Sequence, residues 1–351
     1  MKKKILAAAA VLFLGICPLS VQAAETETMV KSYLTGLDVP ESIGRVRPVA
    51  VMLNNIREGC PQSGIASAGV IYEAPVEGDI TRLMGIFEDY EDLERIGSVR
   101  SCRDYYIFYA NEFDAIYAHY GQSAFALPYF EQHLIDNLNG VKLGSTCYFR
   151  SSDRVAPHNA YTNYELLQQG IDKMGYQREL KEGYEGHYVF AEEGTENTLP
   201  GGQTADEVHF DNYTNNHPWF VYDPETKKYS RFQFGEPQID ELTGEQLTCD
   251  NILVQFSDVT TYEGTTYKKI DTITDGNGNS GGMGKYITRG KAIDIRWQKD
   301  SPWGITHYIT MDNQEVKLNP GVTWVEIVQD DRITDITYWD ENGQQETAVQ
   351  E

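Results

Sequence analysis

Residues 48–53 read Pro48-Val49-Ala50-Val51-Met52-Leu53, and this apolar run stops at Asn54-Asn55. A short continuous apolar run bounded by turn-forming residues is typical of a strand that is buried on both faces. Two further runs of the same kind, 70–74 and 83–87, flank the polar turn 77–79. Three such strands close together in the chain predict a sheet whose faces are covered by other elements.

The segments that follow contain helix patterns as well as strand patterns, and later in the chain the spacing of the apolar residues changes. Residues 105–111, 113–119 and 125–137 mix strand and helix patterns, and 166–174 spaces its apolar residues as a helix does. We therefore expect an α/β domain with a covered sheet over 45–185. Beyond residue 215 the apolar period becomes two, and Arg289-Gly290-Lys291 is typical of a hairpin turn. This pattern predicts a mostly-β C-terminal domain over 215–330, either a small barrel or a bent sheet.

The chain has 351 residues, which is enough for two domains. Residues 186–214 are polar and rich in glycine, so we expect a connector there and separate folding of the two halves. Residues 331–351 look like a tail. The formal net charge of −24 argues against a protein that coats nucleic acid or binds an anionic membrane surface.

The N-terminus predicts export. Three lysines at 2–4 precede an apolar stretch over 5–16, and Val21-Gln22-Ala23 supplies the small residues of a cleavage site. We expect a signal peptide over 1–23, a leader over 24–44 and no transmembrane segment in the mature chain. Lipidation of Cys17 is the alternative, but Ile16 stands where a lipoprotein signal needs a small residue. The expected location is extracytoplasmic, either secreted or associated with the cell envelope.

Four cysteines remain after the leader, and none belongs to a C-x-x-C pair: Cys60, Cys102, Cys147 and Cys249. They allow three disulfide pairings, and the sequence favours free buried thiols over any of these. No metal site is expected. The stretch 275–279 places oxygen ligands as a calcium loop does, but Ser280 replaces the needed glycine and Tyr286 the bidentate glutamate. A glycine-rich hairpin loop explains it better.

Arginine usage is the most informative feature for function. Between Arg45 and Arg178 there are ten arginines but only two lysines, although a generic solvated surface uses both. Arginine is preferred where a planar fork must hold a carboxylate or phosphate with two hydrogen bonds. These arginines either pair with the acids of the same domain or line an anion site. The candidate ligand-binding residues lie in polar segments beside the expected strands: Arg82, Arg100, Arg103, His119, Arg150, His158 and Asn159.

The same segments carry a resemblance to a known family. The runs 47–55, 61–65, 68–73, 80–82, 99–103 and 157–159, followed by 229–231, 250–254, 297–299 and 318–324, resemble the bacterial DUF3048 (YerB-like) family. The resemblance covers roughly residues 45–328 and implies an extracytoplasmic protein with N-terminal and C-terminal DUF3048 domains. Many members are lipoproteins. The resemblance implies no defined activity and no cofactor.

Several functions stay open at this point. The first is binding of a phosphate- or carboxylate-bearing envelope ligand, such as a cell-wall or polyprenyl-phosphate component, in an Arg-rich crevice. The order of Arg and Asp residues also resembles the LytR-CpsA-Psr phosphotransferases, and magnesium would be needed only under that alternative. A cell-wall hydrolase would need a pair such as Cys102–His119, Cys147–His158, Ser123–His119 or Glu73–Glu77. A non-enzymatic scaffold for an envelope protein would use the aromatics of the second half, such as Trp297 and Trp324.

Overall fold

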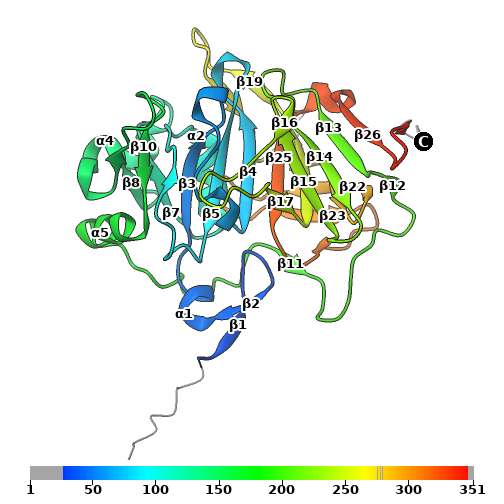
Figure 1. Ribbon diagram of the computed structural model, residues 1–351, viewed down its shortest axis with the longest axis horizontal. Coiled ribbons are helices and arrows are strands. Elements are labelled where there is room, and N and C mark those ends of the chain that lie inside the picture. The colour runs from blue at the N-terminus through cyan, green and yellow to red at the C-terminus, as the bar shows by residue number, and fades with distance from the viewer. Residues whose placement is uncertain (1–26, 275, 277, 279, 347–351) are drawn as a thin grey trace, which may run out of the picture.

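The computed structural model describes residues 27–274, 276, 278 and 280–346. The expected signal peptide, Cys17 and three positions of the 275–279 loop lie outside these residues. The described chain is mostly strands with few helices (Figure 1). The predicted combination of sheet and helix is therefore confirmed, but strands predominate and helices are a minority.

One mixed sheet of eleven strands forms the centre of the molecule. Its order is β12 (Gln203–Thr204), β22 (Lys291–Gln298), β21 (Gly282–Thr288), β18 (Asn251–Ser257), β25 (Thr323–Gln329), β4 (Val70–Pro75), β5 (Thr81–Phe87), β3 (Val49–Asn54), β7 (Ile116–His119) and β8 (Asn137–Asn139), with β23 (His307–Thr310) beside β22. The strands predicted at 48–53, 70–74 and 83–87 are confirmed as β3, β4 and β5. The predicted hairpin turn is also confirmed, because Arg289 and Gly290 join β21 to β22 with φ of 52° and 72°.

A second sheet of seven strands packs over part of the first. It contains β16 (Glu236–Pro237), β15 (Lys228–Gln233), β14 (Trp219–Asp223), β13 (Glu207–Phe210), β26 (Ile336–Trp339) and β27 (Gln345–Glu346), with β17 (Thr248–Cys249) beside β15. Figure 1 shows its green strands in front of β25. The strands of the C-terminal half are thus divided between two sheets, which differs from the single barrel or bent sheet expected. Residues 336–339, expected in a tail, form an inner strand.

The remaining strands form small ladders. They are β1 (Met29–Lys31) with β2 (Asp38–Pro40), β6 (Ile96–Gly97) with β10 (Ala160–Thr162) and β9 (Phe149–Arg150), β11 (Val189–Phe190) with β24 (Lys317–Leu318), and β19 (Val259–Thr261) with β20 (Lys268–Ile270). The expected connector 186–214 therefore contributes three strands. The α-helices are α1 (Glu41–Gly44), α2 (Asp104–Glu112), α3 (Leu127–Glu131), α4 (Gly140–Leu143) and α5 (Tyr164–Met174). Five 3₁₀ turns are η1 (Arg57–Gly59), η2 (Ile65–Ser67), η3 (Glu77–Asp79), η4 (Gly144–Thr146) and η5 (Asp330–Asp335).

The central sheet is buried on both faces, which explains the continuous apolar runs. Val49, Val51 and Leu53 of β3 point into a core that α5 and the second sheet complete. Ala50 and Met52 point into the opposite core, which α2 covers. Each residue of β3 is buried, so the strand keeps no polar face.

The central sheet also joins the two halves of the sequence. β25 pairs with β4 in parallel, with Val325 opposite Tyr72. The residue boundaries of the two predicted domains stay a prediction, but the hydrogen-bonded sheet does not stop at them.

Candidate functional site at the carboxyl edge of the sheet

Seven strands of the central sheet end at one edge. The strands that share this direction are β22, β18, β25, β4, β3, β7 and β8, and β5 runs between β4 and β3 in the opposite sense. β5 therefore begins at this edge, with Thr81 and Arg82. The edge, hereafter the carboxyl edge, lies uppermost in Figure 1. In sheets with parallel strands, ligands bind beyond the carboxyl ends of the strands, so a binding site is expected at this edge.

A short backbone segment, residues 98–102, crosses the ends of β3 and β7. The amide of Asn54 donates to the carbonyl of Ser98 at 3.0 Å, and the amide of Arg100 donates to Met52 at 2.9 Å. On the other side the amide of Tyr120 donates to the carbonyl of Arg100 at 3.0 Å. Arg100 is thus held by main-chain hydrogen bonds to both neighbouring strands, which fixes where its side chain starts.

Three guanidinium groups converge above this segment. We call Arg82, Arg100 and Arg103 the arginine cluster. Arg103 donates from Nε and Nη2 to the two carboxylate oxygens of Glu77, with 2.8 Å between Nε and Oε2. Nη2 of Arg82 lies 3.7 Å from Oε1 of the same carboxylate, and its Nη1 donates to the carbonyl of Ser101. One glutamate is therefore shared between two arginines.

Arg100 is the cluster member whose charge is least compensated. Its Nη1 donates to the carbonyl of Pro157 at 3.1 Å, and its Nε is buried with no hydrogen-bond partner among the described residues. Within the described chain it has no carboxylate in ion-pair range, so the cluster carries three positive charges against one negative charge from Glu77. Burial and the charge of Arg103 lower the pKa of Arg82 to about 10, and the same causes lower the pKa of Arg100.

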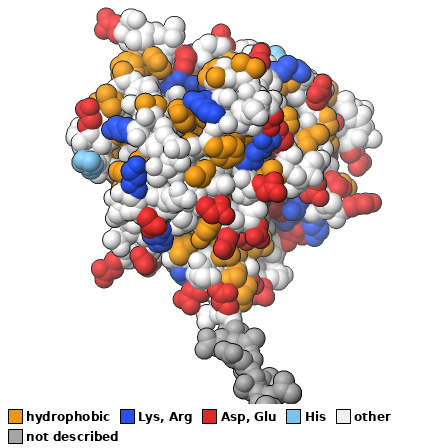
Figure 2. Space-filling model, turned by 60° about the vertical axis from the view of Figure 1, so that its left-hand side comes forward, with side chains coloured by type: hydrophobic (Ala, Val, Ile, Leu, Met, Phe, Trp, Pro, Cys, Tyr) orange, Lys and Arg blue, Asp and Glu red, His pale blue; other side chains and the backbone are white. Residues whose placement is uncertain are grey.

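The pKa of the Glu77 carboxyl agrees with this excess of positive charge. Burial alone would raise the pKa of its carboxyl, but the hydrogen bond and the charge of Arg103 outweigh burial, so the pKa is lowered. On the face shown in Figure 2, basic side chains lie in both halves, and acidic side chains are most frequent in the lower half. An anion entering the cluster would meet net positive charge.

The other predicted residues divide between the rim of the cluster and the interior. His158 follows Pro157, whose carbonyl accepts from Arg100, and Nδ1 of His158 is 2.8 Å from Nδ2 of Asn54. Burial and the charge of Arg100 lower the pKa of His158. Nη1 of Arg150 donates to Oδ1 of Asn159 at 2.9 Å, and its guanidinium stacks 4.4 Å from the ring centroid of Tyr120. Arg150 is exposed, whereas His158 and Asn159 are half-buried, and the three form a rim next to Arg100.

His119 does not join the site. Its ring is buried, its Nδ1 is 2.7 Å from the carbonyl of Gly121, and its Nε2 is 3.2 Å from Oδ1 of Asn137. It stacks on Phe130 with 4.7 Å between ring centroids. Burial lowers the pKa of His119 to about 4. Both ring nitrogens therefore have partners within the protein, so the structure gives no support to the expected ligand contact of His119.

The predicted nucleophile pairs are also not formed in the described chain. The thiol of Cys102 donates to the carbonyl of Arg103 at 3.1 Å, and burial raises its pKa. Oγ of Ser123 accepts from the amide of Ala126 at 3.2 Å. Burial raises the pKa of Cys147 to about 11. None of these groups contacts a histidine as an activated nucleophile would, which removes the structural basis for those hydrolase pairs.

Glu73 belongs to a buried network that the sequence analysis missed. Its carboxylate accepts from Arg231, and Nη1 of Arg231 donates to Glu326 at 2.6 Å. All three side chains are fully buried. One signal was present: Arg231 occupies an inward position of a strand with period two, between the buried residues Tyr229 and Gln233. Glu73 is thus a partner of Arg231, and the glycosidase-type pair with Glu77 is wrong.

The aromatics expected at a docking surface mostly serve the core. Trp297 and Trp324 are fully buried.

All four cysteines of the described chain are free, with three of them buried and Cys60 half-buried. The described residues contain no group of three or more His, Cys, Asp or Glu side chains placed to hold a metal ion. No helix among them has the length and apolar character needed to cross a membrane.

Comparison with known proteins identifies the family of this chain. The model of the "Protein of unknown function (DUF3048) N-terminal domain" matches residues 34–177, and that of its C-terminal domain matches 207–325. The chain is 30% identical over 309 residues to YerB of Bacillus subtilis (strain 168), a candidate lipoprotein, covering 87% of this chain and 88% of that protein. The crystal structure of Bacillus subtilis YerB superimposes with a TM-score of 0.76 at 27% identity, covering 88% of this chain and 98% of the other. Because the models of both domains match, the chain belongs to the DUF3048 family.

Proposed function

We propose that the chain is an exported cell-envelope protein that binds a phosphate- or carboxylate-bearing envelope ligand in the arginine cluster. The supporting observations are the Glu77 carboxylate that Arg82 and Arg103 share, and the neighbouring Arg100, which has no carboxylate within ion-pair range in the described chain. Guanidinium groups with unused donors and incomplete charge compensation are suited to bidentate recognition of an oxyanion.

Arg100 is the central contact in this proposal. Its buried Nε lacks a partner in the described chain, and a buried unsatisfied donor costs about 1–3 kcal/mol. An oxyanion would accept from it and offset its positive charge. His158, Arg150 and Asn159 would then contact the exposed part of the ligand. His119 has no part in it.

An envelope location is supported by two independent points. The sequence carries the features of an exported chain, with a basic start, a short apolar stretch and a cleavage motif. The related YerB protein is itself a candidate lipoprotein. Fractionation of cells, followed by mass spectrometry of the mature N-terminus, would distinguish cleavage after Ala23 from acylation of Cys17.

The binding experiment uses residues 24–351 and three probes: a polyprenyl pyrophosphate, teichoic acid and peptidoglycan fragments, each with and without Mg²⁺. A probe at 100 times its Kd should stabilise the fold by about 2.7 kcal/mol, which a melting curve resolves. Arg100→Lys keeps the charge but loses the bidentate fork, so affinity should fall by about tenfold or more. Arg178→Lys is the matched control, because Arg178 pairs with Asp172 on the surface.

The outcomes separate the alternatives. Equal binding by Arg100→Lys and the wild type would assign the cluster a structural role and favour the scaffold function. Release of phosphate from the pyrophosphate probe only with Mg²⁺ would favour a phosphotransferase.

A further inference from the structure

The hairpin formed by β19 and β20 projects from the carboxyl edge (Figure 1). Its two strands pair only with each other, over three residue pairs. Among the described residues, no main-chain hydrogen bond joins 259–270 to the rest of the chain, and the amide of Asp271 closes the base by donating to Asp258 at 2.9 Å. A two-stranded hairpin is marginally stable by itself, so side-chain contacts must hold this one in place.

Aromatic rings hold the hairpin against Arg103. The ring centroid of Tyr267 lies 5.1 Å from Cζ of Arg103. Phe125 stacks on Tyr262 with 3.6 Å between ring centroids and meets Tyr267 edge-on at 5.9 Å. The hydroxyl of Tyr262 donates to Oδ2 of Asp104 at 2.6 Å, which is the single hydrogen bond between the hairpin and the remainder of the described chain. We call this Tyr262–Asp104 hydrogen bond the latch.

The arginines next to the hairpin are shielded from solvent. The side chain of Arg103 is 4% exposed and that of Arg82 is 6% exposed, whereas Arg100 is half-buried. The Glu77 carboxylate occupies one edge of the Arg103 guanidinium, and the Tyr267 ring covers a face of it. A ligand can therefore reach Arg103 only after one of these two covers has moved.

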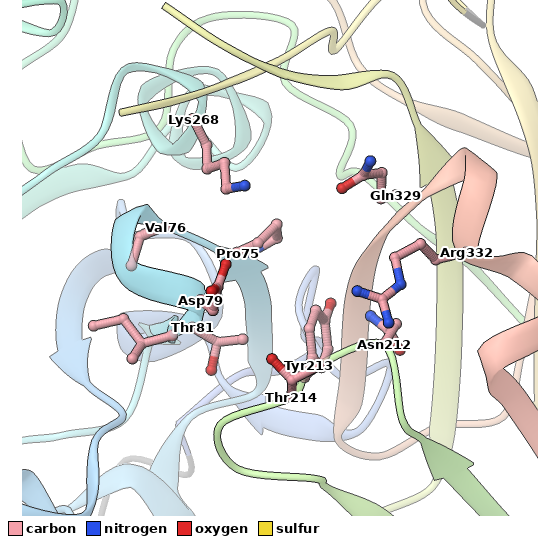
Figure 3. Close-up of a pocket in the computed structure, with 11 residues that line it drawn as sticks. Pro75, Val76, Asp79, Thr81, Asn212, Tyr213, Thr214, Lys268, Gln329 and Arg332 are labelled. Carbon is pink, nitrogen blue, oxygen red and sulfur yellow. The ribbon is translucent and has the colours of Figure 1, made fainter. Parts of the chain in front are cut away.

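The hairpin is the more weakly held of the two covers. Both carboxylate oxygens of Glu77 accept from Arg103, and the amide of Val76 donates to the carbonyl of Ile80 at 2.8 Å across the turn. The hairpin has only its ring contacts and the latch. A crevice of about 60 Å³ lies between Lys268, at the start of β20, and Asp79 on the turn, so the two segments are not packed against each other at this point (Figure 3).

We propose that residues 258–271 form a lid, which is closed over the arginine cluster in the free protein and opens to admit the ligand. This role rests on the function proposed for the cluster. Opening breaks the latch and the ring contacts, and it exposes Arg103 to an anion that competes with the Glu77 carboxylate. Because only the open form binds, the apparent affinity is reduced by the fraction of protein in which the lid is open.

The first test needs no ligand. Hydrogen exchange of residues 24–351, measured by mass spectrometry, follows the hairpin and the start of α2 over 103–106, which Tyr262 and Tyr267 contact. Tyr262→Phe removes only the latch, so exchange in both segments should rise about fivefold. Tyr267→Phe is the matched control, because it keeps the ring over Arg103 and its hydroxyl makes no hydrogen bond in the described chain. Exchange in β25 should be the same in all three proteins.

A covalent lock tests whether opening admits an anion. Since the rings of Phe125 and Tyr262 are 3.6 Å apart, a short bis-maleimide can join cysteines placed at both positions. The variant Phe125→Cys, Tyr262→Cys also carries Cys60→Ser, because Cys60 is half-buried and the other three native thiols are buried. The probe is inorganic pyrophosphate, measured by calorimetric titration before and after cross-linking.

The unlinked variant has lost the latch, so it should bind pyrophosphate at least about fivefold more tightly than the wild type. Cross-linking should weaken its binding by at least about tenfold. The matched control is the same variant treated with N-ethylmaleimide, which modifies both cysteines without joining them and should leave binding tight.

Two results would overturn the lid: a cross-link that leaves pyrophosphate binding unchanged, or a Tyr262→Phe variant in which exchange at 103–106 does not rise. If neither the wild type nor the unlinked variant binds pyrophosphate, the arginine cluster loses its function as a phosphate site. The exchange measurement then decides by itself whether the hairpin opens, so the two proposals can fail separately.

Discussion

Arg231 on β15 and Glu73 on β4 form a fully buried ion pair, although the two residues are 158 positions apart in the chain. Nη1 of the same guanidinium donates to Glu326 on β25 at 2.6 Å. The guanidinium also stacks 4.2 Å from the ring centroid of Trp324 and 4.7 Å from that of Phe220. This single side chain therefore links the second sheet to two adjacent strands of the first.

Replacing Arg231 should destabilise the protein severely. Arg231→Met leaves the buried Glu73 carboxylate without its counter-ion and Glu326 without its hydrogen-bond donor, and breaking a buried pair in this way costs about 3–5 kcal/mol. The measurement is the free energy of unfolding in urea. The triple variant Glu73→Gln, Arg231→Met and Glu326→Gln should recover most of the loss, because it leaves no buried charge. Equal destabilisation of the single and triple variants would attribute the effect to packing.

Glu326 should impose a pH dependence on stability. Burial and the charge of Glu73 raise the pKa of Glu326 to about 8 from 4.5. Between these values the folded protein retains a proton that the unfolded chain releases, so the free energy of unfolding contributed by this group falls as pH rises. The slope is about 1.4 kcal/mol per pH unit at most.

The variant Glu326→Gln carries the neutral form at every pH and should lack that slope. It should match the wild type near pH 5 and exceed its stability near pH 8 in parallel urea titrations. Glu315→Gln serves as the control, because Glu315 is an exposed partner of His307. Identical pH profiles for Glu326→Gln and the wild type would contradict the prediction.

Cleavage of the exposed segment 192–196 should not separate the two halves. A specific protease site placed there produces two fragments that still share the β4–β25 pairing and the Glu73–Arg231 ion pair. We expect both fragments to elute together from a sizing column and to part only in denaturant. Recovery of two separately folded fragments would instead establish the independent domains that the change of apolar period predicted.

Local patterns predicted the strands but not how they assemble. The run over 48–53 identified β3 because every residue of that strand is buried, which leaves a continuous apolar signature. The pairing of β25 with β4 brings Thr323 opposite Val70, and no local pattern encodes a contact across that distance. The inner strand β26 was missed for the same reason: its partner β13 lies in the segment expected to be a connector.

The arginine excess had two sources, and the sequence could not separate them. Arg82 and Arg103 share the carboxylate of Glu77, and Arg100 has no such partner in the described chain, so the anion site stays a prediction for these three. Arg47 pairs with Asp136 at 2.6 Å and Arg95 with Asp153 at 2.7 Å, so these two belong to ordinary surface ion pairs. Which group each arginine contacts depends on where the loops lie in the folded chain, and local sequence patterns do not determine this.

The hairpin of β1 and β2 with α1 lies at the opposite end of the molecule from the carboxyl edge (Figure 1). The chain enters the fold through this hairpin, so any attachment to a bilayer through the residues before 27 would be made at that end. The strands of the central sheet would then point away from the lipid headgroups. In that orientation the arginine cluster would lie at the end of the molecule that is furthest from the point of attachment.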